Sequence, residues 1–183
     1  MSKRIITVFG SSRPLEGSAA YEDARRLGCL LAEAGFAVCS GGYGGVMEGV
    51  SRGAREAGGH TMGVTAEFFI SCANRWVVEE IRVRAWQERL FKLIELGHGY
   101  VAMPGGTGTL VELAVVWEML NKGVLPRKPF VAVGEFWSDV IHRVRSIERT
   151  DPTGTWGEAN QELVHLVATP EEAVALLKRE LCR

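Results

Sequence analysis

Short apolar runs rich in β-branched residues alternate along this chain with longer amphipathic stretches, and this rhythm limits the folds that the chain can adopt. The short runs fit buried strands, and the longer stretches carry apolar residues at helical spacing. Regular alternation of the two is typical of βαβ units, in which helices cover both faces of a parallel sheet. We therefore predict an α/β fold with a parallel sheet of six to seven strands, flanked by helices on both faces.

The expected strands are Ile5–Phe9, Ala37–Cys39, Thr61–Val64, Trp76–Val78, Tyr100–Met103, Phe130–Val133 and Leu163–Val167. The expected helices lie near Ser18–Ala34, Val46–Ala57, Ala85–Leu96, Leu110–Asn121 and Trp137–Ile147. A last helix has a clear start signal, with Thr169 as N-cap, Pro170 at the first helical position and Glu172 at the capping-box position. Asp151–Asn160 is expected to be a loop, and the absence of a linker or repeat predicts a single domain over residues 1–183.

Charge and composition limit the partners and the location of the protein. The 21 Lys and Arg residues nearly balance the 22 Asp and Glu residues, which argues against nucleic-acid binding driven by bulk charge. The N-terminal apolar run is too short for a signal peptide, and the longest uncharged stretch, Leu96–Val111, is broken by glycines. We expect a cytoplasmic protein with neither a membrane nor a nucleic acid as partner.

Glycine-rich turns follow three of the expected strands, and the carboxyl edge of a parallel sheet is where ligands bind. Glycine lets the backbone approach a ligand closely, and the next helix offers free N–H groups to an anion. We predict that a phosphate or nucleotide is bound by Gly105, Gly106, Thr107, Gly108 and Thr109, with Ser11, Gly42, Gly44 and Gly45 as further candidates. The alternative is that these glycines only make tight turns.

Other common nucleotide-binding motifs are missing. The third glycine of a dinucleotide fingerprint is replaced by Val111 in one turn and by Met47 in another. No glycine is followed by Lys-Ser or Lys-Thr, which excludes the ATPase phosphate loop. The four histidines show neither metal-site nor catalytic-triad spacing, and we expect no metal and no cofactor.

Charged residues accompany the third glycine turn. Glu112 follows Thr109 by three residues, which fits a capping box, or it could face a sugar held by the same loop. Upstream, Arg82, Arg84 and Arg89 lie in a charged segment whose side chains are mostly expected to be solvated. One of these arginines could reach the same sheet edge from its neighbouring crossover.

The segment Pro104–Glu112 resembles the PGGxGTxxE signature of the LOG family, long labelled "possible lysine decarboxylase". Glu88-Arg89 falls where that family has its E-R-K segment, and Ser40–Met47 is similar to its GGGxxGLM turn. The likeness runs from about Ile5 to Val133. It implies a modified Rossmann fold, a homodimer or larger homo-oligomer, and an active site near the dimer contact.

The resemblance also implies an activity. Enzymes of the LOG family are phosphoribohydrolases, which split AMP or N6-modified, cytokinin-type AMP into free base and ribose 5-phosphate. By motif position, Arg89 and Glu112 correspond to the catalytic residues. We expect Arg89 to keep Glu112 ionised, because an adjacent cation lowers the pKa of a carboxyl group.

A carrier that binds a nucleotide or the molybdenum cofactor without hydrolysis is the alternative function. Leu90 stands where the family has lysine, Val111 replaces the first of its paired glutamates, and Glu48 replaces a glycine. A pyridoxal-dependent decarboxylase is not expected, because it needs a lysine at the cofactor and none lies in a glycine-rich turn. The apolar series Leu110 to Leu120 after the third turn indicates core packing first and a dimer contact second.

Overall fold

The computed structural model describes residues 3–69, 72–148 and 162–182. Its strands are β1 (Ile5–Phe9), β2 (Ala37–Ser40), β3 (Thr61–Ala66), β4 (Glu79–Val83), β5 (Gly99–Ala102), β6 (Phe130–Val133) and β7 (His165–Val167). Its helices are α1 (Ala19–Glu33), α2 (Val46–Glu56), α3 (Trp86–Leu96), α4 (Thr107–Asn121), α5 (Ser138–Glu148) and α6 (Pro170–Leu181). The predicted α/β class is confirmed.

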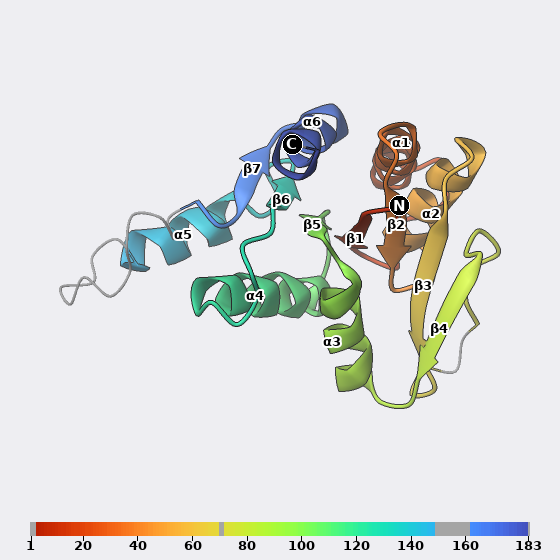
Figure 1. Ribbon diagram of the computed structural model, residues 1–183, viewed down its shortest axis with the longest axis horizontal. Helices are drawn as coiled ribbons and strands as arrows, with labels where there is room; N and C mark the ends of the chain where they lie inside the picture. Colours follow the sequence, from red (N-terminus) through yellow and green to blue (C-terminus); the bar gives the residue numbers. More distant parts are fainter. Residues whose placement is uncertain (1–2, 70–71, 149–161, 183) are drawn as a thin grey trace.

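All neighbouring strands pair in parallel, in the order β4-β3-β2-β1-β5-β6-β7. Helices α1, α2 and α6 cover one face of this Rossmann-like sheet, and α3, α4 and α5 cover the other (Figure 1). Since β1 leads into α1 and β5 leads into α4, two adjacent strands send their chains to opposite faces. The carboxyl ends of β1 and β5 therefore flank a topological switch point, where open α/β sheets bind ligands.

Apolar side chains fill the space on both sides of the sheet. Leu27, Val50 and Leu177 are fully buried on one side, and Leu93 and Ile141 on the other. Burying a side chain of this size contributes about 1.5–3 kcal/mol.

Helix α4 is apolar around most of its circumference, and its predicted apolar series divides between core and surface. Leu113, Trp117 and Leu120 are buried in the core, whereas Leu110 and Ala114 are exposed. Core packing thus accounts for only part of the series.

Two predicted elements are corrected by the structure. The fourth strand was expected at Trp76–Val78 but lies at Glu79–Val83, where it pairs only with β3. Its charged, mostly exposed residues suit an edge strand, and the apolar signal of a buried strand is therefore weak there. Helix α4 begins at Thr107, three residues before the predicted start at Leu110.

The start of α6 is confirmed, because the Glu172 amide donates to the Thr169 hydroxyl at 3.2 Å and Pro170 occupies the first helical position. The predicted loop over Asp151–Asn160 lies outside the described residues. In the described part of the chain, no helix combines the length and apolar character needed to cross a membrane.

Helices α1 and α2 pack closely through glycines. A Cβ atom at Gly28 would lie 2.0 Å from the Val50 carbonyl oxygen, and one at Gly53 would lie 1.8 Å from that of Arg25. A side chain at either position would force the two helices apart.

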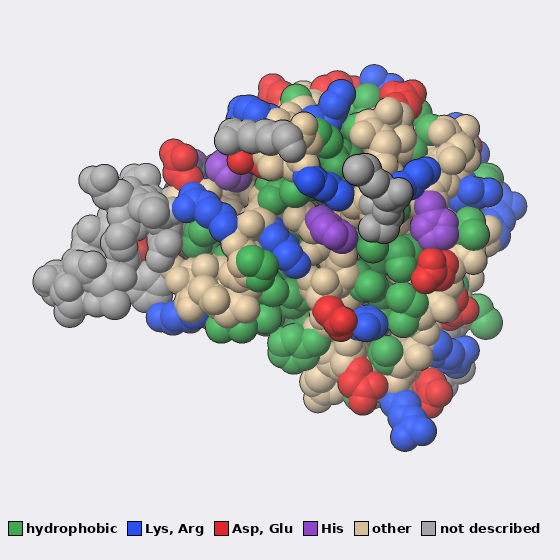
Figure 2. Space-filling view, in the orientation of Figure 1, with side chains coloured by type: hydrophobic (Ala, Val, Ile, Leu, Met, Phe, Trp, Pro, Cys, Tyr) green, Lys and Arg blue, Asp and Glu red, His purple; other side chains and the backbone are tan. Residues whose placement is uncertain are grey.

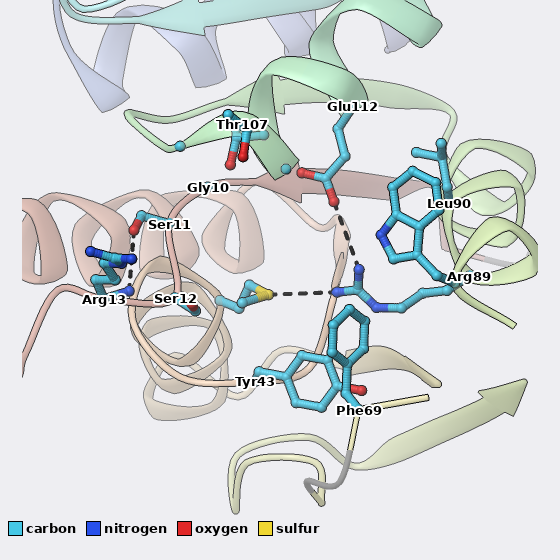
Figure 3. A pocket seen from close by; sticks show the side chains of 15 residues that line it. Gly10, Ser11, Ser12, Arg13, Tyr43, Phe69, Arg89, Leu90, Thr107 and Glu112 are labelled. Carbon is cyan, nitrogen blue, oxygen red and sulfur yellow. Dashed lines mark hydrogen bonds and ion pairs between the residues drawn. The ribbon is translucent and has the colours of Figure 1, made fainter. Parts of the chain in front are cut away.

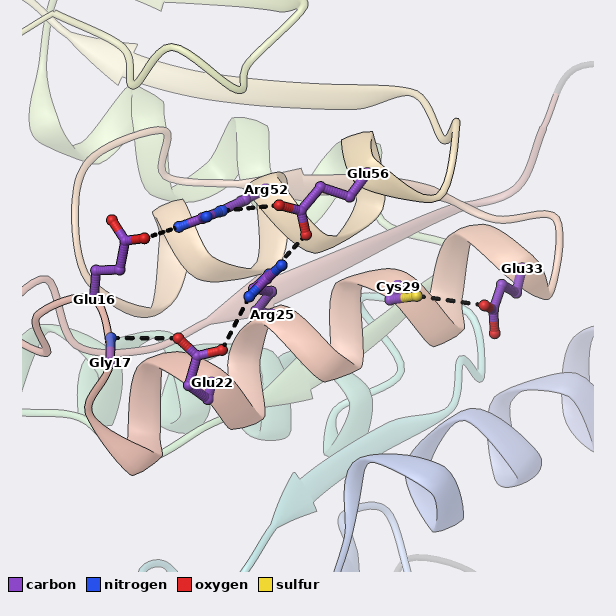
Figure 4. Close-up of polar contacts among 8 residues, drawn as sticks. All are labelled: Glu16, Gly17, Glu22, Arg25, Cys29, Glu33, Arg52 and Glu56. Carbon is purple, nitrogen blue, oxygen red and sulfur yellow. Dashed lines mark hydrogen bonds and ion pairs between the residues drawn. The ribbon is translucent and has the colours of Figure 1, made fainter.

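A network of charged side chains spans α1 and α2 on the outside (Figure 4). Glu56 accepts from Arg25 Nε at 2.6 Å and from Arg52 Nε at 2.9 Å, and Arg25 and Arg52 also pair with Glu22 and Glu16. These contacts hold the pKa of Glu56 below its usual range, with the hydrogen bond from Arg25 as the main cause. On the face in Figure 2, acidic and basic side chains are likewise interspersed rather than gathered by sign.

Candidate active site

A pocket of about 500 Å³ opens at the carboxyl ends of β1 and β5, at the switch point (Figure 3). Its wall comes from the turn after β1, the turn after β2 with the start of α2, the segment after β3, and the N-terminal parts of α3 and α4. The lining residues are Gly10, Ser11, Ser12, Arg13, Tyr43, Met47, Phe69, Trp86, Arg89, Leu90, Gly106, Thr107, Gly108, Thr109 and Glu112.

The N-terminus of α4 forms part of this wall. Gly106 is the N-cap residue, no side chain caps the helix, and its first backbone bond runs from Leu110 N to Gly106 O at 3.0 Å. The amides of Thr107, Gly108 and Thr109 therefore have no acceptor within the helix. Free amides and the positive end of the helix dipole make this end suitable for an anion.

Two glycines at this helix end leave space in the pocket. A Cβ atom at Gly106 or Gly108 would meet no atom within 4 Å, and neither residue has a positive φ. Neither packing nor backbone conformation thus requires glycine there, which favours ligand binding over a purely structural turn. Gly105 lies beside the pocket, where a Cβ would come within 2.2 Å of Thr109 Oγ1.

The glycines Gly42, Gly44 and Gly45 after β2 are not part of the pocket wall, and Gly42 and Gly45 have a structural explanation. Gly42 and Gly45 have φ values of 76° and 66°, which favour glycine. A Cβ at Gly45 would lie 2.4 Å from the Ser11 carbonyl oxygen, which accepts from the Val46 amide at 2.8 Å. Gly45 therefore lets this turn hold the β1 turn in place, while Tyr43 of the same turn contributes to the wall.

Arg89 reaches the pocket from the first turn of α3, with a side chain only 8% exposed. Its Nε donates to the Val64 carbonyl at 2.8 Å, and its guanidinium carbon lies 5.3 Å and 5.7 Å from the ring centroids of Tyr43 and Phe69. A Cβ at Gly41 would come within 1.6 Å of Arg89 Nη2, so glycine is needed there. Burial lowers the pKa of Arg89, and the charge of Glu112 opposes that shift.

Glu112 meets Arg89 across the pocket. Its Oε1 lies 3.9 Å from Arg89 Nη1, and its side chain is 15% exposed. The capping-box interpretation is wrong, because α4 begins at Thr107 and Thr109 is its third residue rather than its N-cap. Glu112 consequently lies in the second turn, with its carboxylate directed toward the guanidinium (Figure 3).

The expected effect of Arg89 on Glu112 is outweighed by burial. Loss of hydration raises the pKa of Glu112 to about 7, and the nearby Arg89 charge only partly lowers it. A separation of 3.9 Å is too long for a hydrogen bond, so the carboxylate lacks the strong contact that would keep its pKa low. Near neutral pH, Glu112 therefore exchanges readily between its ionised and protonated forms.

Comparison with known proteins shows the family of the chain. Residues 3–152 match the SLOG cluster4 family. The chain belongs to this family. The SLOG cluster4 protein is 29% identical over 134 residues to the cytokinin riboside 5′-monophosphate phosphoribohydrolase of Rhodococcoides fascians, covering 71% of this chain and 67% of the relative.

Two solved structures resemble the SLOG cluster4 protein over nearly their whole length. The molybdenum cofactor carrier protein of Chlamydomonas reinhardtii is 25% identical, with a TM-score of 0.73 and 100% of both chains covered. The molybdenum cofactor binding protein of Rippkaea orientalis has a TM-score of 0.77 over 98% of both chains. At 23% identity, the second likeness shows the fold alone.

Several residues in the pocket wall of the SLOG cluster4 protein were not predicted. Arg13 and Phe69 follow β1 and β3 at the carboxyl edge, and the rule that identified the glycine turns would also have indicated them. Trp86 gave no such signal, because it lies in a charged segment at the start of a helix. Of the three arginines upstream, Arg82 and Arg84 are exposed outside the pocket wall.

Among the residues that the structure describes, no group of three or more His, Cys, Asp or Glu side chains is placed to hold a metal ion.

Proposed function

We propose that the protein is a nucleoside 5′-monophosphate phosphoribohydrolase, which cleaves the N-glycosidic bond of AMP or N6-modified, cytokinin-type AMP. The products are the free base and ribose 5-phosphate. The observation that carries the proposal is the meeting of Arg89 and Glu112 in one pocket with the open N-terminus of α4. The relatives named as phosphoribohydrolases support the same class of reaction.

The 5′-phosphate binds at the start of α4 in this proposal. The amides of Thr107, Gly108 and Thr109 would donate to phosphate oxygens, as would the hydroxyl of Ser11. Arg13 adds a positive charge on the same side of the pocket as Ser11 (Figure 3). Binding the phosphate would fix the ribose near Glu112. The binding energy of the phosphate, which does not react, is thereby used to orient the ribose for cleavage.

Glu112 and Arg89 serve the bond cleavage. The C1′–N bond breaks, positive charge develops on the ribose, and a water oxygen forms a bond to C1′ while one of its protons is released and the base acquires one. The ionised carboxylate of Glu112 either stabilises the positive charge or accepts the proton of the water. Arg89 directs this carboxylate, and its charge increases the ionised fraction that burial would otherwise reduce.

A homo-oligomer is part of the proposal. Leu110 and Ala114 are exposed on α4, close to the pocket residues of the same helix. Light scattering on the purified protein tests this point, and a monomer at working concentration would contradict it.

The activity is tested by incubating the protein with a panel of nucleoside 5′-monophosphates and separating free bases by chromatography. We expect base release from AMP or its N6-modified analogues, with ribose 5-phosphate formed in equal amount. Nucleosides, which lack the phosphate, are the control. They should react far more slowly because they have no 5′-phosphate to bind at the start of α4. Intact AMP and intact analogues after long incubation would contradict the proposal.

A carrier protein is the second candidate, favoured by the full-length likeness to the molybdenum cofactor carrier of Chlamydomonas reinhardtii. Leu90, which lines the pocket where the LOG signature has lysine, is compatible with binding without hydrolysis. Tight binding of the cofactor together with no base release from any nucleotide would favour this function over the enzyme.

A further inference from the structure

The pocket wall combines two polar groups of side chains with an apolar remainder. Ser11, Arg13 and the first turn of α4 form one polar group, and the Arg89–Glu112 pair forms the other. Ser12 belongs with the first of these groups, and the remaining side chains in the described wall are aromatic or apolar: Tyr43, Met47, Phe69, Trp86 and Leu90.

The apolar part of the wall offers few polar atoms to the edge of a purine. The Tyr43 hydroxyl accepts from the Ala66 amide at 3.0 Å and donates to the Ala66 carbonyl at 3.4 Å, so it is already engaged. Trp86 supplies an indole N–H, which is only a donor. Such a donor suits ring nitrogens such as N7 and N3, which adenine and guanine share.

The rings of Tyr43 and Phe69 contact each other and the Arg89 guanidinium. The rings of Tyr43 and Phe69 lie 5.5 Å apart at an angle of 71°, and the Arg89 guanidinium lies over both. Aromatic rings and guanidinium planes are the surfaces on which proteins stack unpaired bases. Leu90, only 5% exposed, adds an aliphatic contact rather than a charge at the wall.

We infer that the protein recognises its nucleobase by stacking and ring size rather than by the exocyclic groups on the hydrogen-bonding edge of the base. The substrate class is then purine nucleoside 5′-monophosphates in general, with or without a substituent at N6. The inference rests on the proposed function for the positions of the phosphate and the ribose. A two-ring purine covers more of the aromatic wall than a pyrimidine, so pyrimidine nucleotides bind more weakly.

The first test compares AMP with IMP, which have the same ring size but different hydrogen-bonding edges. Calorimetry on the Glu112→Gln protein, which should hold the ligand uncut, gives the Kd values, and KM values of the native protein provide a second measurement. We expect AMP and IMP to agree within about threefold and CMP to bind about tenfold more weakly. A difference of about a hundredfold or more between AMP and IMP would overturn the inference, because a site that reads the edge rejects the wrong group strongly.

The second test removes the stacking surface. Phe69→Leu and Trp86→Leu should each weaken AMP and IMP about tenfold and equally, while ribose 5-phosphate, which has no base, binds as before. Phe91→Leu is the matched control on α3, since Phe91 is 52% exposed and outside the pocket wall, and it should change nothing. Unchanged AMP binding in both pocket variants would refute the inference.

The two proposals fail in different ways. If no nucleotide releases its base but AMP and IMP bind equally well, the proposed function is wrong and stacking recognition stands. If AMP is hydrolysed but IMP hardly binds, the enzyme stands and stacking recognition is wrong. Failure of every nucleotide to bind would overturn both.

Discussion

The Arg89–Glu112 pair in the pocket and the network of Arg25, Arg52 and Glu56 outside α1 and α2 combine the same kinds of charges with opposite results. In the network, Glu56 Oε2 lies 2.6 Å from Arg25 Nε and the pKa of Glu56 is lowered. In the pocket, Glu112 Oε1 lies 3.9 Å from Arg89 Nη1 and the pKa of Glu112 is raised to about 7. Burial without close hydrogen bonds makes the difference.

This difference separates charges that stabilise the fold from the charges that we propose to act in bond cleavage. The network satisfies its carboxylates and stays near water, so its ionised form costs little. In the pocket pair, the surroundings of Glu112 disfavour its ionised form. A raised carboxyl pKa of this kind is typical of groups that exchange protons or bind a charged ligand. The predictions below test this contrast, from the largest expected effect to the smallest.

Replacing Glu112 should have the largest effect on activity. Glu112→Gln removes the carboxylate but keeps its shape, and we expect base release to fall by about 10²–10⁴-fold. Binding of ribose 5-phosphate should stay near the native value. The matched control is Glu118→Gln on the same helix, where the side chain is exposed and pairs with Lys122, and it should retain native activity. A near-native rate in the Glu112 variant would show that this carboxylate has no catalytic role.

The same variant should stabilise the protein at alkaline pH. The rise in the pKa of Glu112 from 4.5 to about 7 means that its ionised form is penalised by about 3 kcal/mol in the folded state. Below pH 4.5, Glu112 is protonated in both states, and the penalty then grows as pH rises to about 7 and stays constant above it. Urea unfolding at pH 4 and pH 8 should therefore show a gain for Glu112→Gln only at pH 8. Equal stability of variant and native protein at pH 8 would contradict a costly buried carboxylate.

The pH dependence of activity follows from the same group. If the ionised carboxylate acts, kcat/KM should rise about tenfold per pH unit below pH 7 and level off above it. Rates with AMP measured between pH 5 and pH 9 check this profile. An apparent pKa near 4.5 would indicate that burial does not govern Glu112 in solution.

Arg13 should affect binding more than the chemical step. Arg13→Ala removes a positive charge from the pocket wall beside Ser11, and we expect KM for AMP to rise about tenfold with kcat nearly unchanged. The loss should shrink at high salt, because Arg13 is solvent-exposed. Arg84→Ala, which removes an exposed arginine outside the pocket wall, is the control. Identical salt dependence of KM in the Arg13 variant and the native protein would exclude this contact.

The smallest effect is expected in the surface network. Glu56→Gln should cost at most about 1 kcal/mol of stability at pH 7, because the contacts of Glu56 are partly solvated. Since the pKa of Glu56 is lowered, its stabilisation is present above its unfolded value and is lost as pH falls through the folded value. Lowering the pH thus removes a stabilising contribution of ionised Glu56 and a destabilising contribution of ionised Glu112. Thermal unfolding of the Glu56→Gln and Glu112→Gln proteins across this pH range measures both effects. If the stability of the two variants changed with pH in the same direction relative to the native protein, the difference between the two carboxylates would be refuted.

Much of the sheet followed from local sequence. Buried strands such as β1 and β6 have apolar, β-branched residues without interruption, and the predicted ranges Ile5–Phe9 and Phe130–Val133 agree with the structure. The edge strand was misplaced because β4 has a partner on one side only and keeps charged residues. The start of α4 was placed three residues late, because Thr107-Gly108-Thr109 has a turn-like composition while its backbone is helical.

The sequence by itself determined the alternating parallel fold, the glycine-rich helix start and the candidacy of Arg89 and Glu112, since each depends on residues close together in the chain. Only the tertiary structure decided that burial outweighs the Arg89 charge at Glu112, that Gly42, Gly44 and Gly45 lie outside the pocket wall, and that Tyr43, Phe69 and Trp86 belong to it. The physical reason is that desolvation, close approach and stacking depend on atoms that distant segments bring together. Local sequence can place a residue at the sheet edge, but the surrounding segments set the energy of its charge.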